Sequence, residues 1–395
     1  MPTTTFDVLI AGGGVIGSSI AYHLALGSRE SDLRIGVVEK DPTYREASTA
    51  LSVGGVRQQF STPENILLSR HSAAFFRTAG EELAVDGEEP DLGFQKNGYL
   101  FLATAAGIPT LQRNQRIQTE LGASVQLLGR DELRERFPWM EASDLEGGSL
   151  GVRDEGWLDP YSLLQAFKAK ARSLGVEYLE DEVVGFVRAG SRIESARLAG
   201  AGSIPVGSVV NAAGPRAHQL AFMAGIEDLP VRPRKRFVYR IKATEVFRDC
   251  PLVIDPSGVY FRPEGYGYLC GVSPPESKDP DTLDLVMDYT LFEETVWPAL
   301  AHRVPVFDSL KLESSWAGHY AYNTEDQNAI LGPCPGLENF FLANGFSGHG
   351  LQHAPGIGRA LSELILDGRY RTLDLTRFAL SRFSDRSLIR EENVV

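Results

Sequence analysis

Short apolar runs and one stretch with helical spacing alternate along the first forty residues. Residues 6–10 form an apolar run that predicts a buried strand. Residues 18–26 place apolar side chains three and four positions apart, which is typical of a helix. A second strand is predicted at 34–38 and ends at Glu39. This order of strand, helix and strand predicts an α/β unit.

A glycine-rich turn joins the first predicted strand to the helix. Its spacing is G-x-G-x-x-G, in which the first glycine permits a tight turn, the second lets the backbone approach a pyrophosphate, and the third lets helix and strand pack closely. Glu39, which lies 22 residues after Gly17, suits hydrogen bonds from ribose hydroxyls and would repel a 2′-phosphate. The unit therefore predicts a dinucleotide site. The expected cofactor-binding residues are Gly12, Gly14, Val15, Ile16, Gly17, Glu39 and Lys40.

The segment after Glu39 distinguishes between NAD and FAD. An NAD-binding fold would continue with another crossover unit. This chain instead has a small polar loop, whose candidate cofactor contacts are Ser48, Thr49, Ser52, Gly54 and Gly55. A helix is expected next over 62–77, with Thr62 as its N-cap and Pro63 at its first position. Such a loop can lie against a flat ring and a ribityl chain, which favours FAD.

A second glycine-rich loop lies far from the first in the sequence. Residues 340–343 predict a strand, and a helix is expected to begin near Pro355 and run past Leu364. Between them lie Gly345, Gly348, His349 and Gly350. Backbone N–H groups and a helix dipole stabilise the negative charge of a reduced flavin. Two such loops fit FAD better than NAD.

The pattern in the middle of the chain changes after Pro230. Before it, apolar spacing predicts one helix and three strands, at 163–174, 176–179, 183–187 and 206–210. After it, residues 237–241 alternate in polarity, and a hairpin is expected over 259–270, with its turn at 263–265. This pattern indicates an antiparallel sheet, of the kind that would form a wall over a flavin.

Composition and charge exclude several classes of protein. The 395 residues suggest two or three domains, and a net charge of −13 argues against a nucleic-acid binder. The three cysteines form no CxxC pair, so neither a disulfide framework nor a metal site is expected. No apolar stretch reaches the ~18 residues of a membrane span, and no signal peptide is recognised. We expect a cytoplasmic protein, with peripheral membrane association left open.

Together these motifs resemble the D-amino-acid oxidase (DAO) superfamily of FAD enzymes, which includes glycine oxidase, sarcosine oxidase and dimethylglycine dehydrogenase. The resemblance covers nearly the whole chain and is carried by residues 11–17, 39, 48–49, 54–55, 156–160, 209–214 and 345–350. Within the superfamily, residues 52–55, 63–66 and 348–352 resemble a branch of FAD-dependent oxidoreductase-domain proteins linked to the assembly of respiratory complex I.

The resemblance implies a combined α/β and α+β fold with two discontinuous domains. A Rossmann-like FAD-binding domain of the glutathione-reductase type would take residues 1–90, 150–225 and 318–395. A substrate domain built on an antiparallel sheet would take residues 91–149 and 226–317. Further FAD contacts are implied at Val183, Ala213, Gly214, Leu351 and Gln352.

The resemblance also bears on how FAD is held and reoxidised. Sarcosine oxidases tether flavin through a cysteine where this chain has Gly318, and dimethylglycine dehydrogenase uses a histidine where this chain has 50–52. Non-covalent FAD is therefore expected. The lysine that promotes oxygen reactivity in sarcosine oxidases aligns with Leu269, which favours a dehydrogenase. The electron acceptor, whether a quinone, a carrier protein or oxygen, and the oligomeric state stay open.

Four residues are the candidates for substrate chemistry, in which the flavin carries the reaction and the protein orients the substrate. Tyr260 and Arg262 alternate on the expected hairpin strand and would share one face, where Arg262 would hold a substrate carboxylate and Tyr260 would close the pocket. Arg57 would bind an anionic substrate or balance a reduced flavin. Gln352 stands where sarcosine oxidases carry a carboxylate-binding lysine, and it offers only neutral hydrogen bonds. A small anionic substrate is the expected partner.

Three functions follow from these candidates. The first is oxidation of the C–N bond of a small secondary or N-alkylated amino acid, by hydride transfer to flavin N5. The second is oxidation of a 2-hydroxy acid, which would yield a stable ketone in place of a hydrolysable imine. The third is a flavin-binding assembly or scaffold protein with little catalysis, which the complex I-linked branch suggests.

Overall fold

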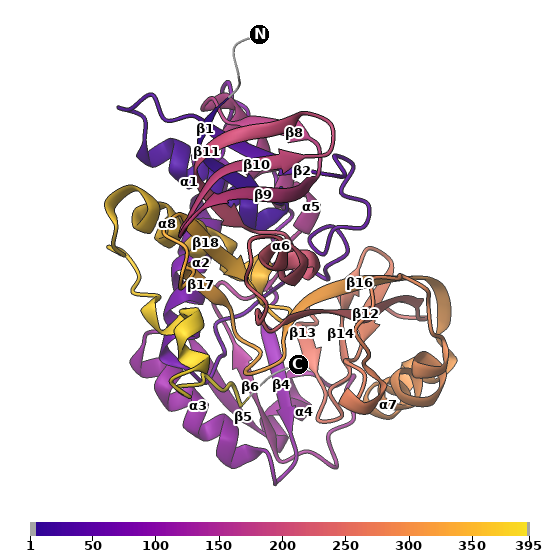
Figure 1. Cartoon of the computed structure of the whole chain (residues 1–395). Helices are drawn as coiled ribbons and strands as arrows, with labels where there is room; N and C mark the ends of the chain where they lie inside the picture. Colours follow the sequence, from indigo (N-terminus) through magenta and orange to yellow (C-terminus); the bar gives the residue numbers. More distant parts are fainter. Residues whose placement is uncertain (1–4, 393–395) are drawn as a thin grey trace.

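Two large sheets form the framework of the computed structural model, which describes residues 5–392 (Figure 1). The first sheet has the strand order β17 (Ile330–Pro333), β18 (Phe340–Asn344), β11 (Gly202–Asn211), β1 (Phe6–Ala11), β2 (Ile35–Glu39) and β8 (Glu177–Glu180). It is extended by β10 (Arg192–Leu198), which pairs with β11, and by β9 (Val183–Ala189), which pairs with β10. The strands β18, β11, β1, β2 and β8 pair in parallel, as the α/β pattern predicted.

The second sheet is mostly antiparallel and lies below the first in Figure 1. Its strand order is β16 (Lys311–Asn323), β12 (Val231–Lys242), β15 (Gly267–Gly271), β14 (Tyr260–Glu264), β13 (Leu252–Ile254), β4 (Tyr99–Ala103), β6 (Gly147–Gly151) and β5 (Val125–Gly129). The antiparallel sheet predicted after Pro230 is therefore present. Its hairpin turns at Gly265 and Tyr266, because Pro263 and Glu264 still pair within β14 and β15. A third sheet joins only β3 (Gly55–Val56) and β7 (Gly156–Trp157).

Helices cover the sheets and supply most of the core beside the first sheet. They are α1 (Val15–Gly27), α2 (Pro63–Glu82), α3 (Ile108–Glu120), α4 (Arg130–Arg136), α5 (Pro160–Ser173), α6 (Ala217–Met223), α7 (Trp297–Arg303) and α8 (Gly350–Asp367). Buried apolar side chains of α1, α2, α5 and α8 form one core on a face of the first sheet. Ser19 on α1 donates a 2.7 Å hydrogen bond to the carbonyl of Ala354 on α8, which fixes the two ends of the chain against each other.

Helix α8 begins five residues earlier than the sequence pattern indicated, at Gly350 and not near Pro355. Proline is common at the first position of a helix, which suggested the later start. Pro355 instead lies inside α8, where it removes one backbone donor. The helix continues through it because Leu351, Gln352 and Ala354 are all buried. The helix N-terminus therefore lies directly at the second glycine-rich loop.

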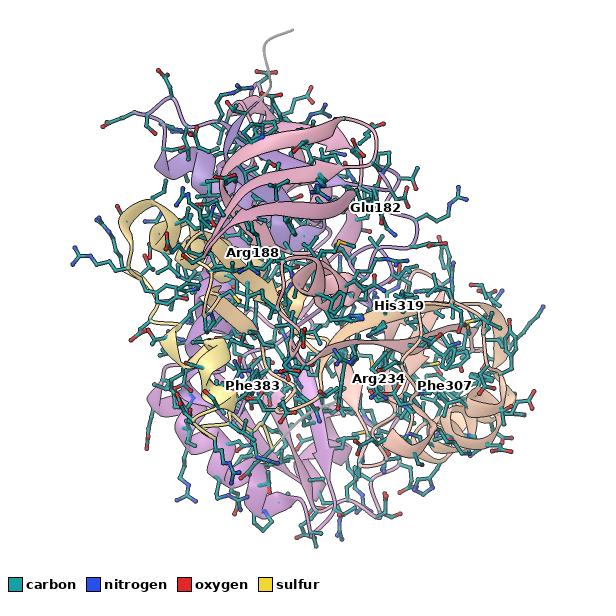
Figure 2. The ribbon with its side chains drawn as sticks, in the orientation of Figure 1. Glu182, Arg188, Arg234, Phe307, His319 and Phe383 are labelled. Atoms are coloured by element: carbon teal, nitrogen blue, oxygen red, sulfur yellow. The ribbon has the colours of Figure 1, made fainter. Side chains whose placement is uncertain are left out.

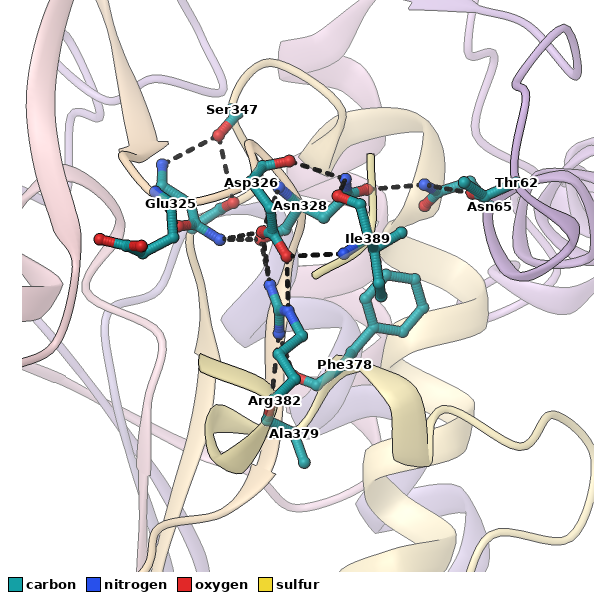
Figure 3. Close-up of polar contacts among 12 residues, drawn as sticks. Thr62, Asn65, Glu325, Asp326, Asn328, Ser347, Phe378, Ala379, Arg382 and Ile389 are labelled. Carbon is teal, nitrogen blue, oxygen red and sulfur yellow. Dashed lines mark hydrogen bonds and ion pairs between the residues drawn. The ribbon is translucent and has the colours of Figure 1, made fainter. Parts of the chain in front are cut away.

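A buried polar network holds residues 378–391 against the rest of the protein (Figure 3). The guanidinium of Arg382 pairs with both carboxylate oxygens of Asp326 at 2.7 and 2.8 Å, and both side chains are almost fully buried. Further along, the carboxylate of Glu391 accepts hydrogen bonds from the backbone N–H groups of Ser61 and Thr62, at 2.6 and 3.3 Å. Thr62 is the N-cap residue of α2, as the sequence predicted, but its hydroxyl makes no capping bond to the helix and donates to Glu391 instead.

The strand pairing crosses the domain boundaries expected from the sequence. β16 pairs with β12 along its length, from Lys311 to Asn323, so the boundary at 318 falls within it. β6 pairs with β4 and β5, so the boundary at 150 also falls within a strand of the second sheet. The division into two domains stays a prediction, and these two boundaries do not coincide with breaks in the sheets.

Candidate functional site

A cavity of about 380 Å³ lies between the two large sheets. Its lining draws on the first glycine-rich turn, the polar loop that follows β2, strands β12, β14 and β16, and the loop before α8. Glu182, beside the first sheet, and His319, on β16 of the second sheet, both belong to this lining (Figure 2). The cavity therefore has walls from both large sheets, and its lining residues come from segments that are far apart in the sequence.

The first turn has the geometry that a dinucleotide needs. Gly12 has φ +106°, and a Cβ there would lie 2.3 Å from the carbonyl oxygen of Ala212, so only glycine fits. The N–H of Gly13 donates to a carboxylate oxygen of Glu39 over 2.8 Å. This contact holds Glu39 at the cavity wall, where its second oxygen accepts from the N–H of Asp41.

The polar loop after β2 closes over the N-terminus of α1. The hydroxyl of Thr49 accepts a 3.1 Å hydrogen bond from the N–H of Val15, and both residues line the cavity. The hydroxyl of Ser48 is buried, also lines the cavity, and has no hydrogen-bond partner among residues 5–392. A phosphate or ribityl oxygen in the cavity would supply that partner, so this end of the lining fits a dinucleotide.

The second glycine-rich loop presents the N-terminus of α8 to the same cavity. Gly348 has φ +98°, and a Cβ there would lie 2.7 Å from the ring of Tyr320. His349, which caps α8, is fully buried, and burial together with the charge of Arg57 keeps its pKa well below the usual value. His349 is therefore neutral at physiological pH, and the positive elements at this end are the helix dipole and the guanidinium of Arg57.

Arg57 lies deep in the cavity wall, immediately after β3. Its Nη2 is 3.3 Å from Nε2 of His349, and its guanidinium carbon lies 4.6 Å from the ring centre of Phe60. The side chain is 4% exposed. Its Nη1 is buried without a hydrogen-bond partner among the described residues. An unpartnered buried guanidinium nitrogen in a cavity wall indicates a site for an anion.

The second sheet contributes three tyrosines to the cavity, of which Tyr99 has its ring centre 5.7 Å from the guanidinium carbon of Arg57. Tyr99, Tyr260 and Tyr320 all line the cavity. Burial raises the pKa of Tyr99 to about 12 and that of Tyr260 well above its usual value. Both hydroxyls therefore stay protonated and can donate hydrogen bonds to a bound anion.

The structure brings three of the four candidate catalytic residues to the cavity. Arg57, Tyr260 and Gln352 line it, whereas Arg262 does not. Arg262 donates to the carbonyls of Val53 and Pro263, both at 2.9 Å, and pairs with Glu264. The pleat puts Arg262 on the same face of β14 as Tyr260, and the two differ because the long Arg262 side chain turns toward the carbonyl of Val53.

Most of the expected cofactor-binding residues also line the cavity. They are Gly12, Gly14, Val15, Ile16, Glu39, Lys40, Ser48, Thr49, Ser52, Gly55, Val183, Ala213, Gly214, Gly348, His349, Gly350, Leu351 and Gln352. Three glycines lie behind the lining. A Cβ at Gly17 or Gly54 would lie about 2 Å from a backbone carbonyl oxygen, and one at Gly345 would lie 3.2 Å from Asn323, so these three permit close packing.

The sequence pattern gave no role to Glu155, whose carboxylate contacts the two residues that follow Arg57. Glu155 is 1% exposed and accepts hydrogen bonds from the N–H of Gln58 and the side chain of Gln59, both at 2.9 Å. Burial raises its pKa to about 7, against the opposing effect of these hydrogen bonds and of Arg57. The only sequence signal for Glu155 was its position directly before the motif at residues 156–160. That position does not show whether the side chain is buried.

Two further observations concern metal-binding side chains and membrane-spanning helices. No group of three or more His, Cys, Asp or Glu side chains within residues 5–392 could hold a metal ion. Within the same range, no helix is both long and apolar enough to cross a membrane.

Comparisons with known proteins agree with this geometry. The model of the DAO family, described as FAD dependent oxidoreductase, matches residues 7–364. FAD-dependent oxidoreductase domain-containing protein 1 of Xenopus laevis is 44% identical, over 100% of this chain and 86% of its own. Mitochondrial sarcosine dehydrogenase of Mus musculus is 27% identical, over 99% of this chain and 43% of its own. The crystal structure of L-proline dehydrogenase from P. horikoshii has a TM-score of 0.87 at 28% identity, covering 98% of this chain and 100% of that one.

The family match spans most of the chain, and it confirms the resemblance inferred from the motifs. It identifies FAD as the cofactor, which the glycine turn in the cavity wall and the unpartnered Ser48 hydroxyl fit. The chain belongs to the DAO family of FAD-dependent oxidoreductases.

Proposed function

We propose that this protein oxidises the C–N bond of a small secondary or N-alkylated amino acid, and that Arg57 binds the substrate carboxylate. The observation that carries the proposal is the Nη1 of Arg57, which is buried in the cavity wall without a hydrogen-bond partner among the described residues. A buried cation without an anionic partner is costly. A substrate carboxylate would form a charge-assisted hydrogen bond with this nitrogen and offset that cost.

The neighbours of Arg57 would orient the rest of the substrate. The side-chain oxygen of Gln352 is occupied by the N–H of Arg57, which leaves the amide NH2 group as its donor. Tyr260 offers a protonated hydroxyl. Bound FAD supplies the hydride acceptor, and the protein's part is to hold the substrate C–H bond against it and to exclude water.

The names of the relatives support the substrate class and the dehydrogenase assignment. Sarcosine and L-proline, after which two of the similar proteins are named, are both amino acids with a secondary nitrogen, and both proteins are named dehydrogenases. In this chain, Arg57 would bind the carboxylate that these substrates share. The acceptor that reoxidises the flavin is proposed only as a class, a quinone or a carrier protein in preference to oxygen.

Non-covalent attachment of FAD is part of the same proposal. Gly318, at the position of the tethering cysteine, has no side chain, and a Cβ there would lie 2.9 Å from the Cβ of Leu51. Neither residue carries a nucleophile. Acid precipitation of the purified protein is expected to release the flavin into the supernatant, whereas a flavin that stays with the precipitate would contradict this part.

The test is anaerobic mixing of the FAD-loaded protein with candidate substrates. L-Proline and sarcosine are expected to bleach the visible flavin absorbance, and lactate and 2-hydroxyglutarate are expected not to. Bleaching by the hydroxy acids alone would support a hydroxy-acid dehydrogenase instead. Failure of amino and hydroxy acids alike, with FAD bound and the protein folded, would favour an assembly or scaffold role.

A further inference from the structure

We propose that Glu155 is a positioning residue for Arg57, and that it takes up one proton from solvent when a carboxylate binds in the cavity. This inference rests on the proposed role of Arg57 in anion binding. It assigns Glu155 a function in tuning that site, in addition to its contacts with the backbone.

The geometry places Glu155 directly against the segment that carries Arg57. One carboxylate oxygen accepts from the N–H of Gln58, and the other from the side chain of Gln59, both over 2.9 Å. The Gln59 side chain is itself fixed, because it donates to the carbonyl of Tyr99 over 2.8 Å and accepts from Ser149 over 2.7 Å. Glu155 therefore cannot move away from Arg57 without breaking a buried network.

The surrounding charges leave Arg57 and Glu155 to balance each other. Asp154, next in sequence, is paired with Arg77 at 2.6 Å and with Lys96 at 3.9 Å. Tyr99 stays protonated because burial raises its pKa. His349 and His353, on α8, are neutral because burial lowers the pKa of each, to about 3 for His353. The charge of Arg57 favours the ionised form of the buried Glu155 carboxylate, and no cation forms an ion pair with Glu155 among the described residues.

A bound carboxylate changes this balance. It offsets the positive charge of Arg57 and adds a second negative charge to a region where charges are poorly screened. Both effects raise the pKa of Glu155, which already lies at about 7. Around and above neutral pH, the ionised Glu155 would then bind a proton as the anion binds, so that the net charge of the buried site is preserved.

Linkage gives this coupling a measurable form. Below about pH 6, Glu155 is already protonated, so the affinity for the anion is independent of pH. Above about pH 7, each bound anion requires one proton, and the dissociation constant rises about tenfold per pH unit. The dissociation constant stops rising when the pH exceeds the pKa that Glu155 has in the complex.

The experiment uses the FAD-loaded protein and 2-furoate, a carboxylate without an ionisable nitrogen. Calorimetric titrations at about pH 8, in phosphate and in Tris, which differ in ionisation enthalpy, give the number of protons exchanged. We expect an uptake of nearly one proton at about pH 8 and almost none at about pH 5.5. The dissociation constants are measured in parallel from the perturbation of the flavin spectrum.

Two variants distinguish the contribution of Glu155 to proton uptake from that of Asp154. Glu155→Gln keeps an oxygen to accept from Gln58 and removes the titrating group, so it should abolish proton uptake and bind 2-furoate about tenfold tighter than the wild type at about pH 8. Asp154→Asn is the matched control, because it removes a carboxylate one position away, and it should retain the proton uptake. If Glu155→Gln does not fold, the two-buffer measurement on the wild type decides alone.

The outcomes distinguish this inference from the function on which it rests. Binding of 2-furoate with no proton exchange and a flat pH profile would overturn the role of Glu155 and leave the anion site intact. Proton uptake that persists in Glu155→Gln would also overturn it. Failure of 2-furoate to bind at any pH, together with no bleaching by amino acids, would overturn both.

Discussion

The backbone N–H of Arg57 donates a 2.7 Å hydrogen bond to the side-chain oxygen of Gln352, which lies 295 positions later in the chain. Arg57 follows β3, and Gln352 lies in the first turn of α8. This contact joins the cavity wall formed by the start of the chain to the helix N-terminus that faces the cavity. The position of the Arg57 guanidinium is therefore set by both segments.

Replacing Arg57 by methionine is expected to weaken substrate binding without loss of FAD. The change removes the charge that would pair with the substrate carboxylate, which costs about 2–5 kcal/mol in comparable buried pairs, or about 30-fold or more in KM. Steady-state kinetics with L-proline or sarcosine and the flavin content of the purified variant measure the two effects. An unchanged KM would exclude Arg57 as the anion-binding residue.

Replacing Arg262 by methionine is expected to lower stability and leave KM nearly unchanged. Its guanidinium bonds to the carbonyls of Val53 and Pro263 and pairs with Glu264, and of these residues only Val53 lines the cavity. Loss of these buried contacts should cost about 1–3 kcal/mol in the free energy of unfolding. Denaturant unfolding and steady-state kinetics measure the two effects. A large increase in KM with normal stability would indicate that Arg262 takes part in substrate binding after all.

Replacing Gly12 by alanine should abolish FAD binding. The residue has φ +106°, and the added Cβ would meet the carbonyl oxygen of Ala212 at 2.3 Å, so the turn must change shape. The purified variant is expected to be colourless and to remain so after incubation with FAD. Gly175→Ala, at a positive φ with open space around it, is a control that should keep the flavin.

The Asp326–Arg382 pair is expected to contribute strongly to stability. Replacing Arg382 by methionine leaves the Asp326 carboxylate buried without its main partner, which costs about 3–5 kcal/mol in similar cases. The expected readout is a lower midpoint in denaturant unfolding. Arg377→Met is the control, because its pair with Glu64 is half exposed and should contribute less than about 1 kcal/mol.

Stability should fall as the pH falls below about 6.5, because several buried histidines are held neutral. Burial lowers the pKa of His23 to about 4 and that of His353 to about 3. The unfolded chain binds protons at these groups near pH 6.5 and the folded protein does not, so each group costs about 1.4 kcal/mol per pH unit below that value. His23→Phe should make the pH dependence shallower by about that amount between about pH 6 and pH 5. An unchanged slope would contradict the assignment.

The sequence predicted those parts of the fold that depend on local spacing. The run of strand, turn and helix around Gly12 appears where the pattern placed it, because each glycine has a local backbone role. The start of α8 was misplaced because Pro355 is a strong local signal, whereas the burial of Leu351 and Gln352 that outweighs it depends on contacts with distant segments.

The sequence predicted which residues lie near the candidate site better than it predicted what their side chains contact. Alternation correctly placed Tyr260 and Arg262 on one strand, but the direction of a long arginine side chain depends on which acceptors surround it. Glu155 is the opposite case, because the sequence did not single it out and the structure places it against the segment that carries Arg57. Its sequence context is unremarkable for an acidic residue, and its burial against Gln58 and Gln59 arises only when β6 and the Arg57 segment meet.

The parallel pairing of β18 with β11, and the packing of α8 on α1, also set the order of events during synthesis. The phosphate-binding turn at residues 12–17 leaves the ribosome first, but the wall formed by residues 348–352 does not exist until those residues have been translated. A nascent chain that lacks them can present only half of the cofactor cavity. We therefore expect flavin to load only after residues 348–352 have been translated.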